Sequence, residues 1–74
     1  MEEAVIVIKN MQDQADADRI MSALEDVWGI GRVEVDLSRN RAKLTFDNRM
    51  AQLQDFERRL LDNGYEVASG SFEQ

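Results

Sequence analysis

A short apolar run near the start of the chain, Ala4 to Ile8, has no polar side chain on either face. From Val5 onward the run is entirely β-branched, and β-branched side chains favour strands. A continuous apolar run of this length is typical of a strand buried inside a sheet. If Ile6 and Ile8 face covering helices, Val5 and Val7 face the open side of the sheet. We therefore predict a central strand here.

The next segment carries apolar side chains at helical spacing. They are Ala17, Ile20, Met21, Leu24, Val27 and Trp28. This spacing predicts an amphipathic helix. It favours a place for Trp28 in the core with the rest of the stripe, and an exposed anchor at the helix end is the alternative. Asp13 or Asp16 can cap the start of the helix, where a carboxylate also suits the helix dipole. Gly29 and Gly31 mark its end.

Residues 32–46 alternate apolar and polar side chains in two runs, which predicts a β-hairpin. The apolar positions of the two runs are Val33, Val35, Leu37, Ala42, Leu44 and Phe46. The turn between them spans Ser38 to Asn40, and Asn40 tolerates a left-handed backbone conformation.

A second helix is predicted from about Met50 to Asn63, because Leu53, Phe56 and Leu60 recur on one face. Gly64 ends this helix.

The chain closes with a predicted short strand over residues 65–68 and a polar tail over residues 69–74. The whole order is strand, helix, strand, strand, helix, strand. That order predicts an α+β, ferredoxin-like sandwich, with both helices on one face of a four-stranded antiparallel sheet. A length of 74 residues allows one domain, 1–74, with a core over about residues 4–68.

Charge and composition exclude several kinds of function. The net charge is −6 and no basic stripe is present, so we expect no nucleic-acid binding. The acidic start and the short apolar runs predict neither a signal peptide nor membrane insertion. We expect a cytoplasmic monomer, or a cytoplasmic module of a longer protein.

Several sequence motifs together resemble a known family. They are Val7 to Met11, Ala23-Leu24, Gly29 to Leu37, Thr45 to Asp47, and Asn63 to Val67. In their order and spacing they resemble the heavy-metal-associated domain of copper chaperones and metal-pumping P-type ATPases. The resemblance covers nearly the whole chain and implies the same βαββαβ fold.

The chain departs from that family at the metal-binding loop. The family signature is Gly-Met-x-Cys-x-x-Cys, and the same frame here runs from Asn10 to Asp16 without a cysteine. Asp13 and Asp16 stand at the two cysteine positions. Copper(I) is a soft ion that needs thiolate or thioether sulfur, so the resemblance does not carry copper binding to this chain. It implies that Met11 packs beneath the loop and that Tyr65 lies near it, where the hydroxyl can hydrogen-bond the loop.

The carboxylates of Asp13, Asp16 and Asp18 leave two interpretations open. They could hold a hard divalent cation such as Mg²⁺, Ca²⁺ or Mn²⁺ through carboxylate oxygens. They could instead be helix-capping and first-turn acids with no ligand. We expect no resident cofactor, with a divalent cation as the alternative.

The chain lacks the groups from which catalytic sites are commonly built. It has no His and no Cys, and it contains no phosphate-binding loop. We therefore predict a non-catalytic interaction or regulatory module of the metal-transport family, whose partner is another protein. The alternative is a domain that binds a hard cation through its first loop.

Overall fold

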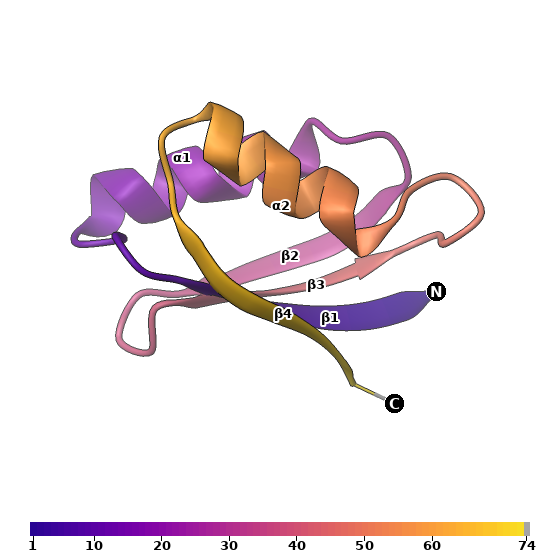
Figure 1. The fold of residues 1–74 in the computed structure, drawn as a ribbon, viewed down its shortest axis with the longest axis horizontal. Helices are drawn as coiled ribbons and strands as arrows, with labels where there is room; N and C mark the ends of the chain where they lie inside the picture. Colours follow the sequence, from indigo (N-terminus) through magenta and orange to yellow (C-terminus); the bar gives the residue numbers. More distant parts are fainter. Residues whose placement is uncertain (74) are drawn as a thin grey trace.

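The protein, seen in a computed structural model, is a sheet with two helices on one side (Figure 1). The structure describes the backbone of residues 1–73 and the side chains of residues 1–68. The elements are β1 (Glu2–Ile8), α1 (Gln14–Glu25), β2 (Ile30–Asp36), β3 (Arg41–Phe46), α2 (Leu53–Asp62) and β4 (Val67–Glu73). The four-stranded sheet has the order β2-β3-β1-β4, and all its pairings are antiparallel. The predicted fold class is confirmed.

Strand β1 is central, as its uninterrupted apolar run predicts. It pairs with β3 on one side and β4 on the other. Ala4, Ile6 and Ile8 are fully buried in the core cluster beneath the helices. Side chains alternate along a strand, so Val5 and Val7 face the open side of the sheet, as predicted.

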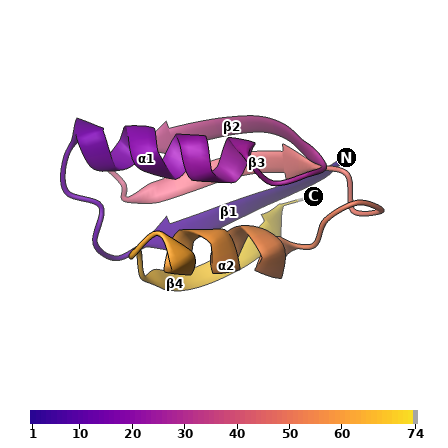
Figure 2. The ribbon, with the colours of Figure 1, turned by 90° about the horizontal axis from the view of Figure 1, so that it is seen from above.

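Both helices bury the faces that the sequence predicts. Helix α1 contributes Ile20 and Leu24 to the core, and α2 contributes Phe56 and Leu60. The Phe56 ring lies 5.1 Å from the ring of Phe46 on β3, centroid to centroid. Figure 2 shows the two helices side by side above the sheet, so the core lies between them and the strands.

Trp28 is not in the core, and that prediction is wrong. Its side chain is 78% exposed. Helix α1 ends at Glu25 and Asp26 is its C-cap, so Trp28 no longer follows the helical phase of the buried stripe. Gly29 then turns the chain toward β2 with a φ of 97°.

Helix α2 begins at Leu53, three residues after the predicted start at Met50. The chain from Asp47 to Ala51 forms a turn instead, in which the Asp47 carbonyl accepts hydrogen bonds from Met50 and Ala51 N–H. The Asp55 carboxylate accepts a 2.7 Å hydrogen bond from Gln52 N–H, which fixes the helix start.

Strand β4 also differs from the prediction, because it covers Val67–Glu73 rather than residues 65–68. The residues predicted as a polar tail pair with β1 as far as Glu73 opposite Glu3. Backbone hydrogen bonds to a neighbouring strand do not require apolar side chains, which is why composition misplaced the strand. Gln74 lies outside the described residues. Among residues 1–73, no helix is long and apolar enough to cross a bilayer.

Candidate functional site

The loop between β1 and α1 is tied to two other connections at the same end of the molecule. The Asn10 side chain donates to the Gly64 carbonyl at 3.0 Å and accepts from Glu66 N–H at 2.8 Å. The Asn40 side chain donates to the Met11 carbonyl at 3.0 Å, and Asn40 has the predicted left-handed backbone, with a φ of 52°. The loop is therefore held by the β2–β3 turn and by the α2–β4 connection.

Met11 is buried beneath this loop, as predicted. Its side chain is 2% exposed and belongs to the core cluster. The thioether therefore packs against apolar neighbours rather than facing solvent as a ligand.

Asp13 is the residue that caps α1. Its backbone is extended, and its carboxylate accepts a hydrogen bond from Asp16 N–H at 2.9 Å. This bond satisfies one of the free N–H groups at the start of the helix. Of the two capping candidates in the sequence, Asp13 is thus the cap.

The Asp16 carboxylate is held by donors from three directions. It accepts hydrogen bonds from Gln12 N–H at 3.0 Å and from the Tyr65 hydroxyl at 2.9 Å. The Arg19 guanidinium lies 3.4 Å away, and the Asp16 side chain is only 17% exposed. Tyr65, itself 5% exposed, thus makes the predicted hydrogen bond to the loop across 49 positions of sequence.

These contacts stabilise the charged form of Asp16. The Gln12 N–H, the Tyr65 hydroxyl and the Arg19 charge together hold the pKa of the Asp16 carboxyl below its usual value, although partial burial acts the other way. Burial and the adjacent carboxylate raise the pKa of the Tyr65 hydroxyl. At neutral pH, Asp16 is therefore an ionised acceptor and Tyr65 a neutral donor.

Asp18 does not join the other two carboxylates. It is exposed and accepts a 3.0 Å hydrogen bond from the Gln14 side-chain amide. It lies two residues beyond Asp16, which is about 200° around the helix. Within the part of the chain that is described, no group of three or more acidic, His or Cys side chains is placed to hold a metal ion. A ligand role for Asp13, Asp16 and Asp18 stays a prediction.

Asn10 and Asn40 are the site residues that sequence reasoning missed. Asn40 was expected only to form a turn, and Asn10 was counted only as part of the loop. Their partners are 29 to 56 positions away, so no local spacing could have identified these bonds.

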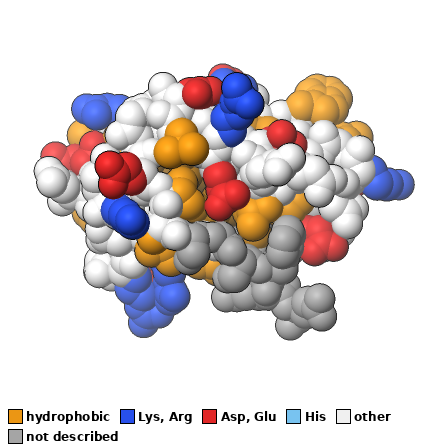
Figure 3. Space-filling view, in the orientation of Figure 1, with side chains coloured by type: hydrophobic (Ala, Val, Ile, Leu, Met, Phe, Trp, Pro, Cys, Tyr) orange, Lys and Arg blue, Asp and Glu red, His pale blue; other side chains and the backbone are white. Residues whose placement is uncertain are grey.

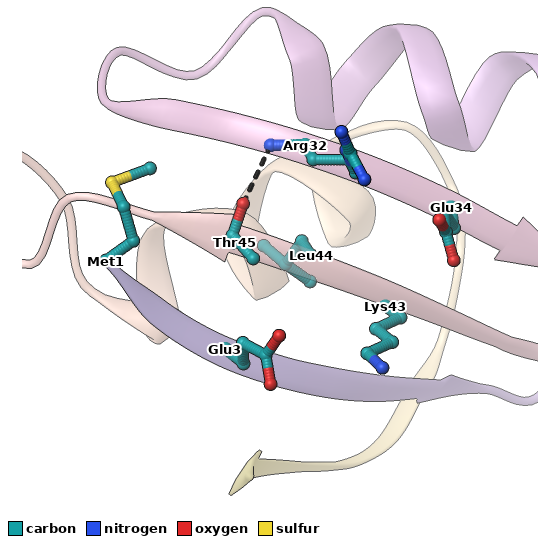
Figure 4. A pocket seen from close by; sticks show the side chains of 7 residues that line it. All are labelled: Met1, Glu3, Arg32, Glu34, Lys43, Leu44 and Thr45. Atoms are coloured by element: carbon teal, nitrogen blue, oxygen red, sulfur yellow. Dashed lines mark hydrogen bonds between the residues drawn. The ribbon is translucent and has the colours of Figure 1, made fainter. Parts of the chain in front are cut away.

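A hollow of about 390 Å³ lies on the open face of the sheet, away from this loop. Figure 4 shows its lining on β1, β2 and β3, where Glu3 and Glu34 lie among Arg32 and Lys43. Thr45 accepts a 2.9 Å hydrogen bond from Arg32 N–H. No nucleophile paired with a base lines this hollow, so its chemistry gives no reason to assign a reaction.

The stability of the domain should depend on pH through Asp16. Because its folded-state pKa is lowered, the stabilisation is complete above the unfolded value of 3.8 and disappears as the pH falls through the folded value. We expect the unfolding midpoint of the wild type to drop on acidification below about pH 4. The drop should be smaller in Asp16→Asn. In Tyr65→Phe it should also be smaller and should end at a higher pH, because the folded-state pKa of Asp16 loses one of the hydrogen bonds that lower it. Thermal unfolding by circular dichroism from pH 2 to 7 measures this, and equal slopes in the wild type and Asp16→Asn would contradict it.

Comparison with known proteins finds solved structures that share the fold of this chain. No protein-family model matches the sequence, and no curated protein matches it. A copper-binding domain from HMA7, a P-type ATPase, superposes with a TM-score of 0.88 at 24% identity, over 100% of this chain and 96% of that one. Oxidised MerP from Ralstonia metallidurans CH34 gives 0.84 at 24% identity, over 97% and 96%. The yeast copper transporter domain Ccc2a gives 0.83 at 18% identity, over 100% and 97%. The protein has the ferredoxin-like fold of heavy-metal-associated domains.

Proposed function

We propose that the chain is a non-catalytic interaction or regulatory module related to metal-transport domains, and that its first loop keeps its shape without a metal. One observation carries the proposal. The Asp16 carboxylate, at a cysteine position of the family signature, is hydrogen-bonded by Gln12 N–H and the Tyr65 hydroxyl. The loop is thereby joined to the helix start and to the α2–β4 connection by the protein's own groups.

The donor atoms at this loop do not fit copper(I). The chain has no cysteine, its loop offers carboxylate oxygens, and the sulfur of Met11 is buried. Copper(I) binds soft sulfur ligands far better than carboxylate oxygen. We therefore do not extend to this chain the copper binding that the names of the structural neighbours state.

The carboxylates also serve a structural purpose that accounts for their positions. Asp13 satisfies the helix N-terminus, and Asp16 accepts hydrogen bonds from two separate segments. An acid in the first turn of a helix is stabilised by the helix dipole without any bound ion. A hard cation at these carboxylates is the competing function, and it would have to compete with these hydrogen bonds.

The remaining parts of the proposal concern the partner and the location. A module that catalyses no reaction acts through its contacts, so we propose another protein as the partner. We further propose that the chain works in the cytoplasm as a monomer.

Copper retention tests the proposal directly. We expect the wild type to lose all added Cu(I) to an equimolar competing chelator, because no thiolate is present. The measurement is copper content after gel filtration under anaerobic conditions, together with amide NMR spectra of residues 10–18. Stoichiometric retention with shifts confined to these amides would overturn the proposal and require a methionine site.

A further inference from the structure

The connection between α2 and β4 contains the dipeptide Asn63-Gly64. The chain has four asparagines, and Asn63 is the one that precedes a glycine, whereas Met11, Arg41 and Arg49 follow the other three. Asparagine is a thermolabile residue, because the backbone nitrogen of the next residue can attack the carbon of its side-chain amide. A glycine in that next position leaves the nitrogen unshielded, since it has no Cβ and its backbone rotates freely.

The reacting groups of this dipeptide lie at the surface. Asn63 and Gly64 are both exposed. A Cβ built on Gly64 would meet nothing within 4 Å, and the φ of Gly64 is 88°, a conformation that suits glycine. Figure 1 shows the connection (gold) at the end of α2, and Figure 3, in the same orientation, shows uncharged polar and backbone atoms (white) over it. Water and solvent base therefore reach the link between the two residues.

Two hydrogen bonds restrain this link in the folded chain. The Asn63 side-chain amide donates to the Arg59 carbonyl at 2.8 Å, and Gly64 N–H donates to the Leu61 carbonyl at 3.0 Å. Asn63 has a ψ of 8°, and its backbone must rotate about this angle before the Gly64 nitrogen reaches the side chain. Both acceptors belong to the end of α2, and helix ends open locally at low cost in free energy. Fraying of this end therefore controls the reaction.

The side chains of the other three asparagines are bonded to distant parts of the chain. The Asn10 side chain bonds the α2–β4 connection. The Asn40 side chain donates to the Met11 carbonyl, and the Asn48 side chain donates to the Glu2 carboxylate. These bonds span 29 to 56 positions of sequence, whereas the Asn63 side chain bonds a carbonyl four positions away. Asn63 is thus the asparagine that local opening of one helix end releases.

We propose that Asn63 is a site of spontaneous deamidation, and that its modification loosens the first loop. The Gly64 nitrogen loses its proton to solvent base and bonds to Asn63 Cγ, while the C–N bond of the side-chain amide breaks and ammonia leaves with a proton from water. Water then opens the five-membered imide. Cleavage between Cγ and the Gly64 nitrogen gives aspartate, and cleavage between the main-chain carbonyl carbon and that nitrogen gives isoaspartate. The co-reactant is water, and nothing is oxidised or reduced.

Both products weaken the end of α2. The new carboxylate cannot donate to the Arg59 carbonyl, and the helix dipole disfavours negative charge at this C-terminal end. In isoaspartate the main chain runs through Cγ, which adds a methylene group directly before Gly64. The Gly64 carbonyl accepts the 3.0 Å hydrogen bond of the Asn10 side chain, so a shift of this carbonyl releases one anchor of the β1–α1 loop.

This inference goes beyond the proposed function and does not depend on it. It describes a slow covalent change that alters the first loop, whichever protein the module contacts and whether or not the loop holds an ion. The change is irreversible in the isolated chain, because the ammonia is lost to solvent.

The test is incubation of the purified full chain at mildly alkaline pH and physiological temperature. Deamidation is located by mass spectrometry of peptides, and isoaspartate is measured with an isoaspartyl methyltransferase. We expect modification confined to Asn63, with aspartate and isoaspartate as products. A synthetic peptide of residues 59–67 should deamidate faster than the folded chain, because it lacks the hydrogen bonds of the helix end.

Two variants separate the parts of the proposal. Asn63→Gln is the matched control, because it keeps a side-chain amide but needs a less favourable six-membered ring, so it should stay unmodified. Asn63→Asp carries the new charge on an unaltered main chain. It should have a lower unfolding midpoint and nearly wild-type amide NMR signals at residues 10–18. The isoaspartate form, isolated by anion exchange, should shift those signals as well.

Three results would overturn this inference. Deamidation of Asn10, Asn40 or Asn48 as fast as that of Asn63 would remove the reason for singling out this site. An unmodified Asn63 in the folded chain, after a time in which the peptide converts fully, would show that the end of α2 does not open. Wild-type signals at residues 10–18 in the isoaspartate form would disprove the link to the first loop.

Discussion

An Asp13→Cys/Asp16→Cys variant is expected to retain Cu(I) against the chelator that strips the wild type. Residue 13 is the N-cap and residue 16 lies in the first turn, three positions later, so their side chains lie on the same side of the helix start. Two thiolates there restore the spacing of the family signature and supply the soft ligands that copper(I) requires. The readout is bound copper after gel filtration with the competing chelator, which should change from none to one ion per chain.

The matched control is Asp13→Ser/Asp16→Ser. Serine removes both charges and has nearly the shape of cysteine, and it is also a good N-cap. The serine variant should fold and retain no copper, so that any retention by the cysteine variant is assigned to sulfur. A folded cysteine variant that also retains no copper would show that the loop backbone, and not only its side chains, departs from the family geometry.

Leu24→Ala is expected to lower the free energy of unfolding by about 2–5 kcal/mol, because it removes a fully buried side chain and leaves a cavity. Leu24 lies on the buried face of α1 within the core cluster. Small domains have total stabilities of about 5–15 kcal/mol, so the variant should lose much of its stability. Urea unfolding followed by circular dichroism gives the difference.

Leu61→Ala supplies the control for this measurement. Leu61 lies on α2 but is 57% exposed, so its truncation should change stability by no more than about 0.5 kcal/mol. Similar losses in the two variants would mean that the assignment of buried and exposed helix faces is wrong.

The fold was predictable because each buried face repeats at a regular spacing. The run in β1, the alternation in β2 and β3, and the stripes of α1 and α2 each depend on near neighbours in sequence, and together they define the sandwich. Trp28 was misplaced because spacing alone does not show where a helix ends, and Asp26 caps α1 before Trp28 is reached. The extent of β4 was missed because its pairing with β1 is a backbone property.

The candidate site was predictable only in its local part. Capping by Asp13 follows from an acid placed just before a helical stripe, and the hydrogen bond of the Tyr65 hydroxyl to the loop followed from the family resemblance. The hydrogen bond from the Tyr65 hydroxyl to Asp16 and the two hydrogen bonds of the Asn10 side chain join segments 49 to 56 positions apart. Such contacts depend on how the strands are ordered in space. No short motif in the sequence indicates that order.

The account rests on one claim about the first loop, that its carboxylates serve as structural acceptors and not as metal ligands. The Asp16→Asn variant keeps one oxygen, which can accept from Gln12 N–H in place of Oδ2. Its amide group replaces Oδ1, the acceptor of the Tyr65 hydroxyl, and the charge that a hard cation prefers is removed. The most direct measurement is thermal unfolding of the wild type and Asp16→Asn at neutral pH and constant ionic strength. Each is measured with chelator and then with millimolar Ca²⁺, Mg²⁺ or Mn²⁺.

We predict that neither protein changes its unfolding midpoint when any of these cations replaces the chelator. An ion that binds only the folded state would raise the midpoint by mass action. A rise specific to one cation in the wild type, absent from Asp16→Asn, would contradict the account and assign the loop to a carboxylate metal site.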